Sequence, residues 1–134
     1  MNTALKKNIL ATVEFPIKMP LEDLATKLGM TFNGLIFERE KTGRFDEVPA
    51  LVAQQSDMTF IIFGVPEGEL GDAYVLELSA ETLLPIPEFR KTIPGFVSSF
   101  LTDKDINSRG YFDYSSELAN ALCSVGMKDC KATS

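Results

Sequence analysis

The order of strand-like segments in the middle of the chain constrains the fold most. Between residues 35 and 79, four segments with the apolar pattern or the Ile, Val and Phe content of strands follow one another, and no helical spacing separates them. They are residues 35–40, 45–52, 58–65 and 73–79. The first two flank a polar turn with Gly43, which can adopt a positive φ, and therefore predict a β-hairpin. Consecutive strands without crossover helices favour an antiparallel meander.

Two of the predicted strands differ in character. Residues 58–65 are apolar on both faces, which is typical of a strand in the interior of a sheet. Residues 8–15 alternate apolar and polar side chains until Pro16, which indicates a further, half-buried strand ahead of the meander.

Amphipathic helices are predicted on either side of the meander. Between Pro20 and Gly29, leucines and an alanine recur at helical spacing, with acidic residues in the first turn. A second helix is predicted to begin at the candidate N-caps Ser115 and Ser116 and to end at Gly126. These patterns together predict an α+β fold, with helices packed against an antiparallel sheet of about four or five strands.

The length of 134 residues suits one hydrophobic core, so a single α+β domain over residues 1–134 is expected. Prolines interrupt the chain after Leu84, where only residues 95–102 could form a short helix. The segment from about residue 128 is expected to be frayed. The longest apolar runs are too short to cross a membrane, and the first residues lack the pattern of a secretion signal, so a cytoplasmic location is expected.

The composition disfavours most enzymes. The chain contains no histidine, which removes the commonest general base and the commonest zinc ligand. Gly64, Gly68 and Gly71 do not have the spacing of a phosphate-binding loop. We therefore expect no catalytic residue, no metal and no cofactor.

Two local patterns have both a functional and a structural interpretation. Asp103, Asp105 and Asn107 match the first ligand positions of a calcium loop, but Ser108 and Tyr114 stand where Gly and Glu are needed, so an ordinary turn is favoured. The only two cysteines are expected to be free thiols, and the first to be a core residue rather than a nucleophile. On one continuous helix their spacing of seven would separate them by roughly 10 Å, too far for a disulfide unless the chain near Gly126 broke the helix.

The acidic charge is concentrated in residues 45–89, which we call the acidic middle. This region holds nine acidic residues and no Lys or Arg, whereas the rest of the chain holds ten acidic and thirteen basic residues. Such a field repels nucleic acid and membrane phosphates and accelerates encounter with basic proteins. Solubility alone is the alternative explanation. Candidate apolar anchors beside the acids, each also a core candidate, are Phe45, Leu70, Tyr74 and Phe89.

Four short pieces between residues 28 and 78 resemble immunity proteins of bacterial contact-dependent growth inhibition and related polymorphic toxin systems. They are Leu-Gly-Met at 28–30, Phe-Asp-Glu-Val-Pro-Ala at 45–50, Phe-Gly-Val-Pro-Glu at 63–67 and Tyr-Val-Leu-Glu-Leu at 74–78. The resemblance implies a cytoplasmic, non-enzymatic protein that binds one cognate toxin, often a nuclease. It identifies no binding residue in this sequence.

Charge and resemblance together predict an immunity protein that neutralises a basic toxin domain as a monomer bound 1:1, without binding nucleic acid or membrane. An exposed strand edge could add a docking line. The expected partner-binding residues are Asp46, Glu47, Asp57, Glu67, Glu69, Asp72 and Glu77. Two alternatives stay open: an acidic secretion chaperone with an apolar groove, and a small ligand- or metal-binding module.

Overall fold

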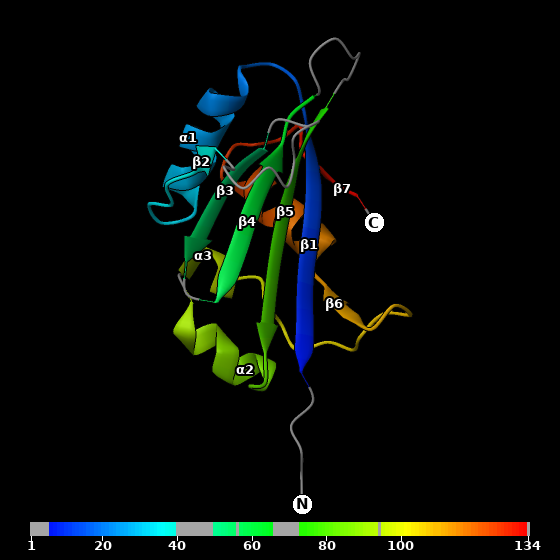
Figure 1. The fold of residues 1–134 in the computed structure, drawn as a ribbon. Coiled ribbons are helices and arrows are strands. Elements are labelled where there is room, and N and C mark those ends of the chain that lie inside the picture. The colour runs from blue at the N-terminus through cyan, green and yellow to red at the C-terminus, as the bar shows by residue number, and fades with distance from the viewer. Residues whose placement is uncertain (1–5, 40–49, 56, 66–72, 94, 134) are drawn as a thin grey trace, which may run out of the picture.

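The computed structural model describes residues 6–39, 50–55, 57–65, 73–93 and 95–133 (Figure 1). The strands are β1 Lys7–Pro16, β2 Glu38–Arg39, β3 Ala50–Gln55, β4 Met58–Phe63, β5 Ala73–Thr82, β6 Tyr111–Asp113 and β7 Lys131–Ala132. The helices are α1 Leu21–Thr31, α2 Ile86–Phe89, the 3₁₀ turn η1 Arg90–Thr92, α3 Gly95–Ser98 and α4 Ser115–Ser124.

All these strands join one sheet in the order β2-β3-β4-β5-β1-β6, and β7 also pairs with β1. The antiparallel order of β2 to β5 and the interior place of β4 agree with the sequence, although β3 ends at Gln55 rather than at residue 52. The turn at Gly43 that the sequence predicts to join the first two strands lies outside the described residues. The predicted count of four or five strands is too low, and the sheet is mixed because β6 runs parallel to β1. The two strands that the sequence did not predict, β6 and β7, have only three and two residues and are too short for an alternation to be seen.

The outer edge of β1 has three neighbours in succession. β6 pairs with residues 8–10 of β1, and β7 pairs with Val13 and Glu14. Between them the amide of Thr12 donates to the Oγ of Ser115, at 2.8 Å. A serine at the start of α4 therefore fills the gap where neither strand offers a carbonyl.

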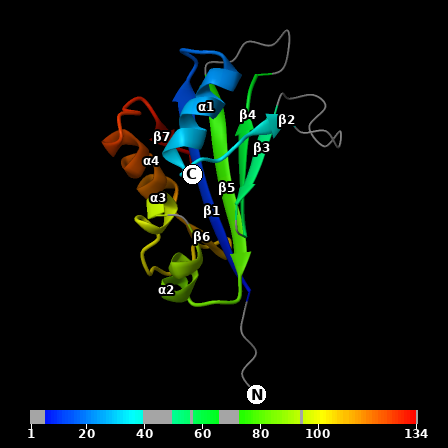
Figure 2. The same cartoon turned by 90° about the vertical axis from the view of Figure 1, so that its left-hand side faces the viewer.

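The helices lie on one side of the sheet, and the hydrophobic core lies between the two layers (Figure 2). Every second side chain of the long strands enters this core, among them Ala11 and Val13 of β1 and Leu76 and Leu78 of β5, each with 0% exposure. The α+β class is thus confirmed. No helix in the described ranges is long and apolar enough to cross a membrane.

Helix α1 continues two residues past Gly29, where the sequence predicts its end. Gly29 instead allows the backbone of Leu35 to pack closely against the helix, because a Cβ at this position would lie 2.2 Å from the carbonyl oxygen of Leu35. The left-handed residues that reverse the chain come later, at Asn33 with φ 62° and Gly34 with φ 87°. The amides of Gly34 and Leu35 both donate to the carbonyl of Gly29, at 2.9 Å.

The second predicted helix is present as α4, and Gly126, with φ 105°, lies just beyond its end. The short helix expected in residues 95–102 covers only Gly95–Ser98. Helix α2 was not predicted, because Pro85 and Pro87 read as breakers, whereas a proline is tolerated in a first helical turn. The sequence predicts fraying from about residue 128, yet β7 lies in that segment.

Candidate protein-binding face

The side of the sheet away from the helices forms the candidate binding surface, which we call the open face. It is built by the strand positions that alternate with the core residues, and no helix of the described chain lies over it (Figure 2). Its members are Asn8, Leu10, Thr12 and Glu14 of β1; Val75, Glu77, Ser79 and Glu81 of β5; Thr59, Ile61 and Phe63 of β4; and Val52 and Gln54 of β3.

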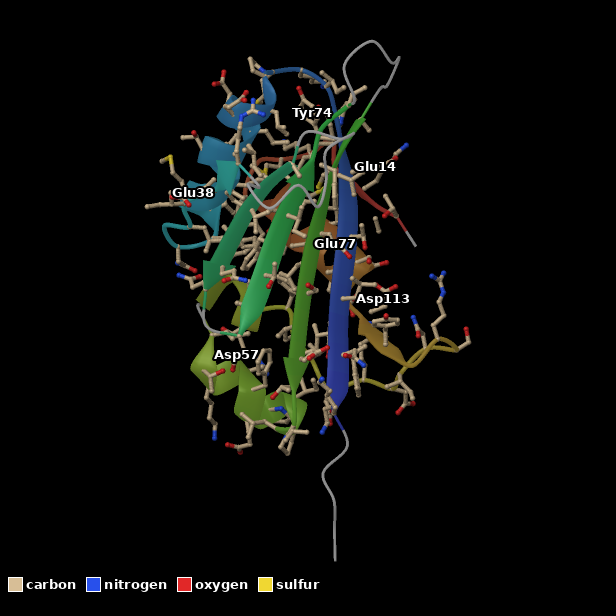
Figure 3. The ribbon with its side chains drawn as sticks, viewed as in Figure 1. Glu14, Glu38, Asp57, Tyr74, Glu77 and Asp113 are labelled. Atoms are coloured by element: carbon tan, nitrogen blue, oxygen red, sulfur yellow. The ribbon has the colours of Figure 1, made fainter. Side chains whose placement is uncertain are left out.

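Glu77 lies at the centre of this face. In the strand register it is directly opposite Thr12 of β1 on one side and Ile61 of β4 on the other. Its side chain is partly exposed, and Figure 3 shows it on the strand between β4 and β1. A carboxylate in this position is part of the sheet surface itself rather than of a loop.

A shallow polar hollow of about 580 Å³ extends from Glu77 toward the end of the sheet where β1 begins. Three carboxylates line it, those of Asp57, Glu77 and Glu81, and Asp57 comes from the turn between β3 and β4. Polar side chains of Asn8, Thr59, Ser79 and Tyr111 complete the wall. The hollow therefore offers many acceptors, and no Lys or Arg of the described residues lines it.

The acids of the open face differ in whether a cation neutralises them. Glu81 pairs with Lys6 at 2.8 Å, and Glu14 pairs with Lys131 at 3.3 Å. Within the described ranges, neither Glu77 nor Asp57 forms an ion pair or a side-chain hydrogen bond. Lys6 and Lys131 therefore neutralise Glu81 and Glu14, whereas no cation of the described residues neutralises Glu77 or Asp57.

Two of the seven predicted contact residues can be placed. Asp57 and Glu77 lie around one hollow, as a shared contact surface requires. The other five predicted residues lie outside the described residues: Asp46, Glu47, Glu67, Glu69 and Asp72.

Sequence reasoning missed three acids of the same surface. Glu81 belongs to the acidic middle but was not predicted as a contact, and Glu14 and Glu38 lie outside that region. Glu38 pairs with Val52 in the register of β2 and β3, which places it on the open face (Figure 3). The alternation along β1 is the signal that could have identified Glu14, because it assigns Asn8, Leu10, Thr12 and Glu14 to one face.

The candidate apolar anchors that can be placed are core residues. Tyr74 is 9% exposed, and its hydroxyl donates to the carbonyl of Met19 at 2.9 Å. Phe89 is 1% exposed. Phe45 and Leu70 lie outside the described residues.

Two polar side chains near β6, Asp113 and Asn107, have structural contacts. The Oδ1 of Asp113 accepts from the amide and the hydroxyl of Ser115, at 2.9 and 2.6 Å. The side chain of Asn107 accepts from the amides of Arg109 and Tyr111, both at 3.0 Å, which closes a hydrogen-bonded turn over residues 107–111, at the end of the Asp-rich segment. Among the described residues, no group of three or more acidic or cysteine side chains is arranged to hold a metal ion.

Two raised pKa values belong to residues of the helix layer. Burial raises the pKa of Tyr114 to about 12, and the nearby charges of Glu117 and Asp103 add to the effect. Burial also raises the pKa of Cys130 to about 12, together with a hydrogen bond to Cys123. Both groups are therefore protonated at neutral pH.

The chain matches no family model, and no curated protein or solved structure matches it. What the open face can do follows from its residues: carboxylates and hydroxyls accept hydrogen bonds from ammonium and guanidinium groups. Such a surface is complementary in charge to a basic partner.

Proposed function

We propose that this protein is an immunity protein: it binds a basic toxin domain in the cytoplasm, one to one, through the open face and the acidic middle, and performs no catalysis itself. The observation that carries the proposal is the hollow around Glu77 and Asp57. Two carboxylates there have no cation among the described residues, on a sheet face that no helix of the described chain covers.

A basic partner can supply the cation that Glu77 and Asp57 lack among the described residues. A carboxylate that stays unpaired in a shared acidic hollow is repelled by its neighbours, and a partner's Lys or Arg relieves this repulsion. Thr59 and Ser79 beside the acids can accept further hydrogen bonds from such a side chain. The face also presents apolar side chains, Leu10 and Val75, which a partner can bury.

A toxin domain that cleaves nucleic acid fits this surface. Its active site must hold phosphates and is therefore basic, so an acidic protein surface can occupy the same site. The four sequence pieces that resemble immunity proteins support the same assignment and are partly independent of the charge, because they include Asp46, Glu47, Glu67 and Glu77.

The direct test uses the reading frame adjacent to and upstream of this gene. The C-terminal domain that it encodes is expressed in bacteria from an inducible promoter, with and without this protein. We expect growth arrest without it, rescue with it, and a 1:1 complex on co-purification. A harmless neighbouring frame, or a toxic domain that this protein neither binds nor neutralises, would contradict the proposal.

One observation favours an acidic secretion chaperone as a second candidate. A mainly apolar groove of about 420 Å³ lies between α1 and β3, and Met30 and Ile36 at its border are each 78% exposed. A chaperone that holds an unfolded effector needs such a groove and usually forms a dimer. Sizing chromatography separates the two candidates: a monomer that forms a 1:1 toxin complex supports immunity, and an obligate dimer supports the chaperone.

A further inference from the structure

The two cysteines lie next to each other although seven residues separate them. Helix α4 ends at Ser124, and Gly126 with φ 105° turns the chain back along the helix. The Sγ atoms of Cys123 and Cys130 are then 3.8 Å apart. The sequence-based estimate of roughly 10 Å assumed one continuous helix, and the break near Gly126 removes that assumption.

The surroundings hold both thiols in place. The Sγ of Cys123 is 3.8 and 3.9 Å from the carbonyl oxygens of Lys128 and Cys130, and the Sγ of Cys130 is 3.5 Å from that of Ala119. Cys130 is 7% exposed, whereas Cys123 is partly exposed. One thiol is therefore accessible from solvent and the other lies directly behind it.

We propose that Cys123 and Cys130 are a reversible redox pair, which low-molecular-weight disulfides oxidise to an intramolecular disulfide that ties β7 to α4. A disulfide bond is about 2.05 Å long, so the sulfurs must approach by roughly 2 Å. Rotation of the two side chains can supply that displacement, because Cys123 is only partly buried.

The oxidation proceeds by two exchanges. The thiolate of Cys123 attacks one sulfur of the external disulfide, forms a mixed disulfide and releases one thiolate, which takes up the proton lost by Cys123. The thiolate of Cys130 then attacks the Sγ of Cys123, forms the intramolecular bond and releases the second thiolate, which takes up the proton of Cys130. Two protein thiols are oxidised and one external disulfide is reduced to two thiols.

The order of the exchanges follows from accessibility. Cys130 is buried and its pKa is raised to about 12, so it reacts poorly with reagents in solution. Once the first exchange has occurred, however, the Sγ of Cys123 in the mixed disulfide is only 3.8 Å from the Sγ of Cys130, which can attack it. Cys123 is therefore the attacking residue and Cys130 the resolving one.

The disulfide would restrain β7, which pairs with β1 at the edge of the sheet. Cys130 directly precedes β7, whose Lys131 pairs with Glu14 of the open face at 3.3 Å. The amide of Thr133, just after β7, donates to the carbonyl of Thr12 at 3.0 Å. Oxidation therefore fixes the strand that supplies the cation for one of the open-face acids.

The test incubates the folded, reduced protein in glutathione buffers of increasing oxidised fraction, followed by acid quenching, intact mass measurement and peptide mapping. We expect the wild type to lose two hydrogens and to yield a peptide linking the two cysteines. Cys130→Ala should stop with one glutathione on Cys123. Cys123→Ala should acquire little glutathione, because Cys130 is buried.

Circular dichroism of each variant shows whether it is folded, and the wild-type measurement does not depend on either variant. Oxidation should also slow hydrogen exchange of the Thr133 amide several-fold, because β7 is then tied at both ends. A wild type that keeps a single glutathione like Cys130→Ala, acquires two, or stays reduced throughout would overturn the proposal.

Discussion

At Gly29 the backbone of α1 touches the segment that follows the helix. The nearest atom to an added Cβ is the carbonyl oxygen of Leu35, at 2.2 Å, and backbone cannot move aside as a flexible side chain can. We expect Gly29→Ala to reduce the free energy of unfolding by about 2–3 kcal/mol, the cost of overpacking. Urea denaturation followed by circular dichroism measures this change.

Gly95→Ala is the matched control for that substitution. Gly95 also lies in a helix, but, apart from its chain neighbours and the helix's own backbone, no described atom lies within 4 Å of its added Cβ. Alanine favours the helix there, so its stability should be equal or slightly higher. Equal effects at the two glycines would show that the contact with Leu35 does not determine the need for glycine.

The raised pKa of Tyr114 predicts that the free energy of unfolding depends on pH in the alkaline range. Its side chain is fully buried, its hydroxyl donates to the carbonyl of Thr102 at 2.5 Å, and its pKa is raised from 10.0 to about 12. Below pH 10 both folded and unfolded states keep this proton. Between pH 10 and 12 only the unfolded state loses it, so stability falls as pH rises, by about 2–3 kcal/mol in total.

Tyr114→Phe removes that dependence. At pH 7 the variant should be less stable by about 1 kcal/mol, because the hydrogen bond is lost. Between pH 10 and 12 its deficit relative to wild type should shrink and then reverse, because only the wild type loses about 2–3 kcal/mol there. The ionisation of Cys130 cancels in this difference. Denaturation curves at several pH values test this, with the exposed Tyr111→Phe as control. A deficit that stays constant to pH 12 would contradict the assignment.

Among the elements, the junction of β1 and α4 depends on one hydroxyl. Ser115 is 2% exposed, and its Oγ accepts from the Thr12 amide at 2.8 Å while donating to Asp113 at 2.6 Å. We expect Ser115→Ala to cost about 1–3 kcal/mol, because the Thr12 amide then lacks its partner. Hydrogen exchange of that amide should accelerate accordingly.

Ser116→Ala is the control within the same helical turn. Ser116 is exposed and makes no side-chain hydrogen bond in the described structure. Its replacement should change stability by less than about 0.5 kcal/mol. If both variants behaved alike, the gap between β6 and β7 would not need the hydroxyl.

The elements that the sequence predicts well are those long enough to show a period. β1 and β5, with ten residues each, and α1 with eleven could be identified because burial alternates or recurs along them. β6 and β7 depend on pairing with β1 that is distant in sequence, and no local pattern encodes such pairing. The sequence names a break at Gly126 as the condition for the contact between the cysteines, but it does not show how far the chain turns back there.

At the scale of the whole molecule, the sequence predicted that the middle of the chain is acidic, but not which acidic side chains share one face of the sheet. The acidic middle contains Glu77 and Asp57, which line one hollow, but it is a stretch of sequence, and surfaces are made by register across strands. Register brings Glu14 and Glu38, from outside that stretch, onto the open face. A composition count cannot show this, because it ignores which positions of different strands lie side by side.

If the open face meets a basic toxin, reversing its central charge must slow association. We expect Glu77→Lys to lower the association rate constant about 3–10-fold at low ionic strength, with a weaker salt dependence. Asp23→Lys, on α1 in the other layer, changes the net charge equally and should leave the rate nearly unchanged. Stopped-flow mixing with the toxin domain at increasing salt measures both.

The salt dependence of the association rate distinguishes a charge at the contact surface from an effect of net charge alone. Above about 0.5 M the screening length falls below roughly 5 Å, so the rates of wild type and Glu77→Lys should converge. Asp57→Lys should follow Glu77→Lys, because both carboxylates line the same hollow. If Asp23→Lys slowed association as much as Glu77→Lys, only the net charge of −6 would matter, and the open face would lose its role as the contact surface.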